Sequence, residues 1–295
     1  NVSAIDVKYG KLILTGKGSI VAYGLNSAAI RVKGAITAGN SNYAHVTVGR
    51  KLRLFAPNYY GIFVAPNYNS AYGITIDFHG TIVARDGICI HRHIQGRGEN
   101  APVIKVADKA KITVDENEGI ALHAGGFGRW QIGAAVITGS TGLVASTGDI
   151  EISKAKILAT GNFDPNLTQP DSLQLGAVVQ ILDIESSRLN LTINGGEYTS
   201  AQGYTFAEDT TEGHSLRDFS ILDGDFAGRQ GVFYGLAPAQ AEHSATHVLG
   251  GTFNADVKNY LGDDCHLERN RRTNIYTVID DSEPEEILDD ATLLA

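Results

Sequence analysis

The sequence is short of cysteine, of charged residues and of long apolar runs, and each shortage excludes a class of protein. Two cysteines in 295 residues cannot build a disulfide framework. Charged residues make up 19%, which argues against a disordered chain and against a helical bundle rich in Glu and Lys. The longest apolar stretches, such as residues 176–181, are too short to span a bilayer, so no membrane insertion is expected. The net charge of −9 repels phosphate backbones, and no nucleic-acid partner is expected.

A residue pattern recurs along most of the chain. Each copy has a short apolar strand of period two, a turn with a small residue, and a second apolar strand. The copies read LILTGKGSIVAYG (12–24), KLRLFAPNYYGIFV (51–64), ITIDFHGTIVARDGICI (74–90), IKVADKAKITVDENEGIAL (104–122), IEISKAKILATG (150–161), LTINGGEYTSAQGYTF (191–206), FSILDGDFAGRQGVFYG (219–235) and HVLGGTFNAD (247–256).

One apolar position in the second strand aligns all eight copies. Most steps between these positions are close to 30 residues, and the two longer steps are predicted to hold inserts at residues 127–146 and 162–175. The aligned residues are Ile20, Leu54, Ile82, Ile112, Ile157, Tyr198, Phe226 and Phe253.

This repeat predicts an all-β fold, a right-handed single-stranded parallel β-helix (a solenoid) of about eight or more coils. One unit cannot bury its own apolar side, whereas stacked copies bury a continuous interior. Antiparallel sandwiches also have many short strands, but they do not repeat one residue pattern eight times. We expect one domain over residues 1–279. Residues 280–295, with seven acidic residues among sixteen, are expected to form a solvated C-terminal tail.

Part of the chain resembles a known group of proteins. The run NAPVIKVADKAKITVDENEGIALHAGGFGRWQIGAAVITGSTGLVAS (100–146) and the ending LGGTFNADVKNYL (249–261) with IYTVID (275–280) are similar to uncharacterised β-helix surface proteins of gut Gram-positive bacteria and their phages. The chain departs from their pattern at ADKAK (107–111), where Gly-Gly turns are common. The resemblance implies a pectin-lyase-like β-helix displayed on a surface, and it implies no defined activity.

A possible metal site lies in GICIHRHI (87–94). Cys89, His91 and His93 alternate there, so on a strand they would face one side, and thiolate with imidazole is a zinc ligand set. His123 occupies the equivalent point of the next coil, and stacking could bring it close to Cys89 or His91. The alternative is that this strand face carries ordinary half-buried polar side chains, and no cofactor is expected.

The acidic residues offer weak candidates for catalysis. Glycoside hydrolysis needs two carboxylates across the scissile bond, and Asp149 with Glu151 or Asp183 with Glu185 would have suitable spacing on a strand. A lyase would need carboxylates holding calcium and a basic residue, for which Asp77, Arg85 and Asp86 are candidates. Any outward strand face presents such pairs, so no catalytic residue is assigned.

Aromatic side chains in predicted loops are candidates for ligand binding, because exposed rings stack on sugars and anchor protein partners. The alternative is that they pack over the flank of the solenoid, which we expect for the only tryptophan. The candidates are Tyr59, Tyr60, Tyr68, Tyr72, Phe127, Arg129 and Trp130.

Two functions follow as hypotheses. The first is a non-catalytic structural and binding module, extracellular, on a phage particle (head fibre, decoration or tail appendage) or on a bacterial cell surface. Its partners would be a host glycan or protein, and a homo-oligomer such as a trimer is expected. The second is a polysaccharide lyase or glycoside hydrolase with its active site in a groove on the flank of the β-helix.

Overall fold

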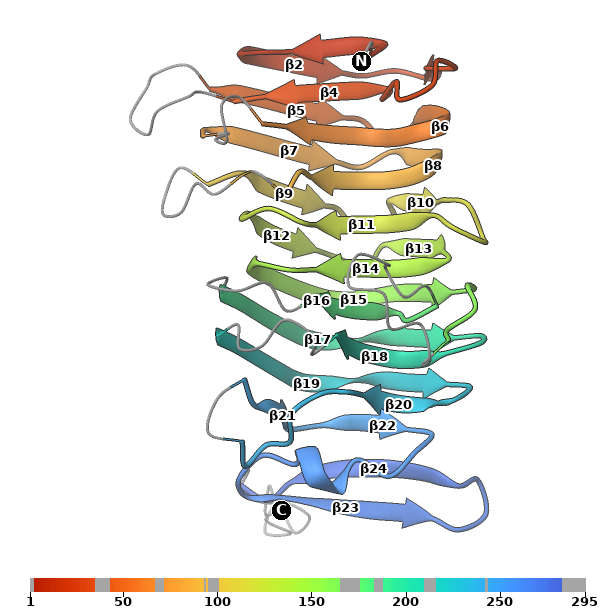
Figure 1. The fold of residues 1–295 in the computed structure, drawn as a ribbon, viewed down its shortest axis with the longest axis vertical. Helices are drawn as coiled ribbons and strands as arrows, with labels where there is room; N and C mark the ends of the chain where they lie inside the picture. Colours follow the sequence, from red (N-terminus) through yellow and green to blue (C-terminus); the bar gives the residue numbers. More distant parts are fainter. Residues whose placement is uncertain are drawn as a thin grey trace, which may run out of the picture.

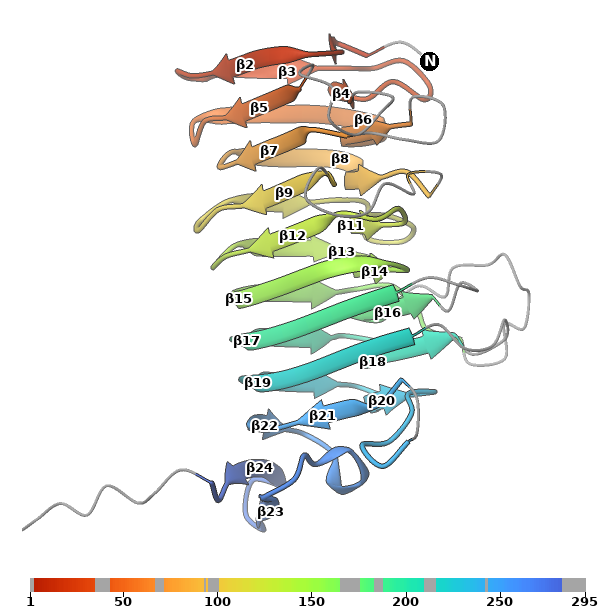
Figure 2. The same ribbon diagram turned by 90° about the vertical axis from the view of Figure 1, so that its left-hand side faces the viewer.

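The chain folds into a column of stacked coils. The computed structural model describes residues 3–34, 43–66, 72–92, 94, 101–164, 176–182, 188–209, 216–241 and 244–282. Successive coils pair through parallel strands, and the first coil lies at the top of the column and the last at the bottom (Figures 1 and 2). This arrangement is a parallel β-helix, so the fold class predicted from the repeat is confirmed.

Three strand faces run the length of the column. Face A contains β2 (Gly10–Leu14), β5 (Ala44–Val48), β7 (Ile74–Phe78), β9 (Val103–Val106), β12 (Arg129–Ile132) and β21 (Thr246–Val248). Face B contains β3 (Gly18–Val21), β10 (Lys111–Thr113), β13 (Val136–Gly139) and β22 (Gly251–Phe253). Face C contains β1 (Ile5–Val7), β4 (Ile30–Lys33), β11 (Ile120–Ala124), β14 (Thr141–Ala145), β16 (Val179–Leu182), β18 (Tyr204–Asp209) and β20 (Gly231–Tyr234).

Five long strands bend around a corner and serve two faces. Two of them pass from face B to face C, namely β6 (Leu52–Ala65) and β8 (Thr81–Ile90). Three pass from face A to face B, namely β15 (Gly148–Ala159), β17 (Arg188–Ser200) and β19 (Leu216–Gly228).

The interior is a set of in-register ladders of apolar side chains. The aligned position of the repeat forms one of them, because all eight predicted residues occupy the same rung position on face B. Aliphatic residues fill this ladder in the upper coils. In the lower coils Tyr198, Phe226 and Phe253 stack with 4.9 Å between successive ring centroids. Offset ring stacking of this kind adds to the burial of apolar area.

The predicted insert at residues 127–146 is wrong. These residues contain β12, β13 and β14, which make a complete coil that pairs above and below. Ile137 supplies the missing rung between Ile112 and Ile157. The repeat in the sequence does not reveal this coil, because its corners are short. Ile137 is therefore closer in sequence to Ile112 and Ile157 than the usual step of about 30 residues. The second predicted insert, 162–175, lies mostly outside the described residues.

The two ends of the column differ. In the first coil the inward residues Ile5, Leu12, Leu14 and Ile20 are only partly buried against the core. At the other end, β23 (Cys265–Asn270) and β24 (Ile275–Asp280) form an antiparallel hairpin, preceded by a 3₁₀ turn at Lys258–Tyr260. β24 also pairs antiparallel with β22, so it covers the edge of the last parallel coil. Residues 283–295 of the predicted tail lie outside the described part of the chain.

A buried ion pair interrupts the apolar interior in the lower coils. Arg217 replaces an apolar rung below Leu189, and Glu208 does the same below Ile181. The guanidinium Nε and Nη2 donate to the two carboxylate oxygens of Glu208 at 2.8 Å each, and Nη1 donates to Thr246 Oγ1 at 2.9 Å. Arg217 is fully buried, so its charge depends on this bidentate pairing.

Replacing Arg217 alone should therefore be costly. We expect Arg217→Met to lower the free energy of unfolding by about 3–5 kcal/mol, because Glu208 is left buried without its counter-charge. The double variant Arg217→Met with Glu208→Leu should recover most of that loss. Guanidinium unfolding of the three proteins measures both effects, and a double variant as unstable as the single one would contradict this account.

Candidate functional site

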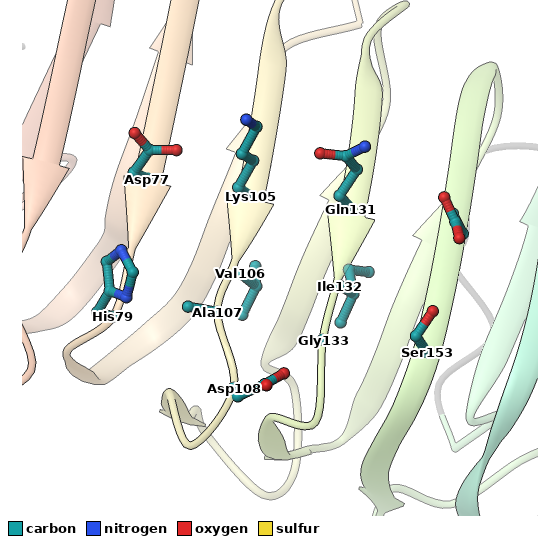
Figure 3. A pocket seen from close by; sticks show the side chains of 11 residues that line it. Asp77, His79, Lys105, Val106, Ala107, Asp108, Gln131, Ile132, Gly133 and Ser153 are labelled. Atoms are coloured by element: carbon teal, nitrogen blue, oxygen red, sulfur yellow. The ribbon is translucent and has the colours of Figure 1, made fainter.

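A ladder of polar side chains runs along the outside of face A. Each strand presents one outward residue between two inward rungs, and the parallel register aligns these central residues from coil to coil. Figure 3 shows three of them projecting side by side from neighbouring strands, namely Asp77, Lys105 and Gln131. The polar ladder comprises Thr47, Asp77, Lys105, Gln131, Glu151, Thr192, Ser220 and His247.

An open hollow of about 460 Å³ crosses the middle of this ladder. It extends from β7 to β15 and reaches the corner between face A and face B (Figure 3). Seven of its eleven lining residues are polar, and we call it the face A groove. The lining residues are Asp77, His79, Lys105, Val106, Ala107, Asp108, Gln131, Ile132, Gly133, Glu151 and Ser153.

Several carboxylates in and beside the groove are held by hydrogen bonds. His45 Nε2 lies 2.8 Å from Asp77 Oδ2. The backbone N–H of Ala134 donates to Asp108 Oδ1 at 2.8 Å, which fixes this side chain at the corner. The groove thus offers fixed acceptors next to the amide of Gln131 and the ammonium of Lys105. Such a mixture of donors and acceptors suits a ligand that carries many hydroxyl groups.

The two ladder carboxylates of the groove are too far apart to act on one glycosidic bond. Asp77 and Glu151 lie three strands apart on face A, through β9 and β12. At the usual spacing of parallel strands this separation is about 14 Å. Glycosidase carboxylates lie roughly 5 to 10 Å apart.

The structure separates the residues proposed for a lyase. Asp77 lies on face A, whereas Arg85 and Asp86 lie at the far corner of β8, between face B and face C. Asp86 is buried, and its carboxylate accepts hydrogen bonds from Arg85 Nε at 2.9 Å and from the backbone N–H of Ile120 at 3.0 Å. The predicted grouping of these three residues is therefore wrong. The corner between face A and face B and the first half of β8 separate Asp77 from Arg85 and Asp86. Asp183 and Glu185 lie outside the described residues.

The predicted stacking of His123 on Cys89 is confirmed. The two residues are register partners on face C, and Cys89 Sγ lies 3.8 Å from His123 Nδ1. The ring of His91 packs edge-on against Phe63. Within the described residues, no three His, Cys, Asp or Glu side chains are grouped so that they could hold a metal ion. His93, the remaining candidate, lies outside the described part.

Burial controls the ionisation of this pair. It raises the pKa of the Cys89 thiol, which disfavours the thiolate that would bind a metal. Burial, with a smaller contribution from the charge of His91, lowers the pKa of His123 to about 4. The pair is therefore a neutral thiol and a neutral imidazole at pH 7.

This low pKa predicts a pH dependence of stability. Below its ordinary pKa of about 6.5, His123 binds a proton in the unfolded chain but not in the folded chain. The free energy of unfolding should therefore fall as the pH is lowered from about 6.5 towards 4. The variant His123→Gln should lose less stability across this window than the parent, as measured by denaturant unfolding at several pH values. The same pH dependence in both proteins would contradict the assignment.

The aromatic candidates are mostly packed against the protein itself. Tyr59 and Tyr60 form a cluster with Phe63 on the outside of face C, with ring centroids 4.7 Å apart between the two tyrosines. Trp130 points inward and is only 1% exposed, as one rung of a core ladder between Ile104 and Ile150. It cannot stack on an external ligand without unfolding the coil.

The remaining candidates have different surroundings. Phe127 and Tyr72 are half-buried, and Tyr68 lies outside the described residues. Arg129 is the candidate nearest the groove. It projects outward from face A, two residues before Gln131 of the polar ladder, and its register partner on β15 is Asp149. Among the described residues, no Phe, Tyr or Trp side chain lines the groove.

Sequence reasoning missed most of the groove, although a signal was present. On face A, seven successive coils contain an apolar–polar–apolar triplet, and the middle residue of that triplet is the outward one. The triplets are VTV (46–48), IDF (76–78), IKV (104–106), WQI (130–132), IEI (150–152), LTI (191–193) and FSI (219–221). These middle residues lie on the first strand of each unit, whereas the repeat is aligned on the second strand.

Comparisons with known proteins add no name to this architecture. No family model matches the chain, no curated protein matches it, and no solved structure matches it. The fold defines the class of protein, a parallel β-helix with a groove along one face. In the described part of the chain, no helix is long and apolar enough to cross a membrane.

Proposed function

We propose that the protein is a non-catalytic binding module that holds an extended glycan in the face A groove. The observation that carries the proposal is the polar ladder, which places a donor or acceptor side chain on every coil from β5 to β19. Neighbouring rungs are about 4.8 Å apart. A linear polymer lying along the column would meet a similar polar contact at each step.

The chemistry of the groove supports a glycan in preference to an apolar ligand. Asp77, Lys105, Gln131 and Ser153 offer both donors and acceptors in an open hollow, and water-exposed hydrogen bonds of this kind are individually weak. Affinity would then come from the number of contacts along the polymer. The separation of Asp77 and Glu151 does not fit a pair of acid and base.

The groove is tested by removing two neutral polar side chains. The variant Gln131→Ala with Ser153→Ala should lower the affinity for the bound glycan about tenfold or more, because two hydrogen bonds are lost. Binding of the full chain to extended polysaccharides and to purified cell-wall glycans measures the effect. The matched control is Ser19→Ala with Thr113→Ala, two exposed residues on face B. Equal affinities for parent and groove variant, or release of sugar fragments by the parent, would contradict the proposal.

Display outside the cell is the second part of the proposal. A rigid column whose recognition surface is a strand face suits a phage head fibre, decoration or tail appendage, or a bacterial surface protein, and a homo-oligomer such as a trimer would multiply the groove. Immunogold labelling of purified phage particles and of intact cells tests this placement. Gold on virions would identify a phage structural component, and gold on the wall a bacterial surface protein. Gold found only in the cytoplasm would overturn this part of the proposal.

A further inference from the structure

A second surface, at the corner between face A and face B, has a regular positive charge. Three coils carry the same basic–apolar–basic triplet at this corner, KLR (51–53), KAK (109–111) and KAK (154–156). The apolar residue points inward, and the two basic residues are exposed. We call these six residues the basic strip, namely Lys51, Arg53, Lys109, Lys111, Lys154 and Lys156.

The triplets fall on alternate coils. On face B, Arg53 pairs in register with Thr81, Thr81 with Lys111, Lys111 with Val136, and Val136 with Lys156. Each basic pair is therefore separated from the next by one coil without charge at this position. Two strand steps correspond to about 9.6 Å between successive basic pairs.

Most of the strip has no carboxylate partner among the described residues. None of the outward residues that pair across face B from β3 to β15 is acidic. Among the described residues, Lys156 is the only member of the strip that pairs with a carboxylate, that of Glu197. Lys156 is also the last residue of the strip. Asp108 lies next to Lys109 at the corner, and its carboxylate accepts the backbone N–H of Ala134. A row of mostly unpaired basic side chains is unusual on a chain whose net charge is −9.

The backbone provides a second and independent observation. Lys109 and Lys154 have φ angles of 65° and 60°, in the left-handed region that disfavours residues with a Cβ atom. The equivalent corner one coil below Lys154 uses Gly195, with φ of 77°. Glycine would relieve the same backbone at both lysine positions. A lysine there costs stability relative to glycine, and its charge is what distinguishes it from the glycine of the coil below.

We infer that the basic strip binds a linear acidic polysaccharide whose anionic group recurs on every second sugar. Alternate coils supply the cations, and a sugar unit in an extended chain is comparable in length to one coil. Duplex nucleic acid fits less well, because its phosphates are far denser than cations about 9.6 Å apart. The strip borders the face A groove but is a different surface, so it can bind whether or not the groove does.

The test uses a variant that should fold better and bind worse. Lys109→Gly with Lys154→Gly removes two charges and relieves two left-handed residues, so the thermal midpoint should stay the same or rise. Affinity for hyaluronan, which has one carboxylate per disaccharide, should fall about tenfold at low salt. A charge-matched control is Lys8→Gln with Lys258→Gln, two exposed lysines outside the strip, which should leave the affinity within about twofold.

Three further probes separate the possible ligands. Polygalacturonate carries a carboxylate on every sugar, dextran carries none, and duplex DNA carries dense phosphates. The parent should prefer hyaluronan to dextran, with an affinity that falls as salt is raised. The gain in stability without loss of hyaluronan affinity in the glycine variant would overturn the inference. So would tighter binding of duplex DNA with the same dependence on Lys109 and Lys154, which would reassign the strip to nucleic acid. The glycine variant should keep the parent's affinity for neutral extended glycans, whose binding depends on Gln131 and Ser153 in the groove, so that failure of one surface is distinguishable from failure of the other.

Discussion

Because every coil pairs in register with the coils above and below it, an inward position in one coil is also an inward position in the next. This parallel register constrains the whole interior. It allows aliphatic residues to follow one another down face B and then to give way to a stack of rings at Tyr198, Phe226 and Phe253. It also makes the ion pair of Arg217 with Glu208 stand out, because these two polar residues occupy rungs that are apolar one coil higher.

The same register organises the outside of the column. Outward residues are free of packing constraints, yet they are lined up at a spacing of about 4.8 Å. Two different surfaces result from this alignment. The face A groove combines carboxylates, an amide, a hydroxyl and one ammonium group, whereas the basic strip at the adjacent corner repeats a single charge on alternate coils. A stacked fold can thus turn a short motif into a linear binding surface without any loop.

The candidate residues show where local patterns mislead. Aromatic side chains in predicted loops were natural candidates for sugar stacking, but Trp130 is a core rung and Tyr59 packs on Phe63. Asp77 and Asp86 are close in sequence but do not share a face, because the chain turns from face A to face B between β7 and β8, and Asp86 lies at the next corner, between face B and face C. The stacking of His123 on Cys89 was predictable, since it requires only the coil period and no knowledge of the corners.

The sequence alone determined the all-β class, the parallel β-helix and the aligned core ladder, because a period of about 30 residues with an apolar position in each copy can be buried only by stacking. It could not reveal the short coil through Ile137, since the lengths of corners vary and the spacing of that coil departs from the period. Tertiary structure alone decided which polar residues share a surface. The outward side chains of Asp77, Lys105 and Gln131 are roughly 26 to 28 residues apart in the chain, and only the register between coils brings them side by side.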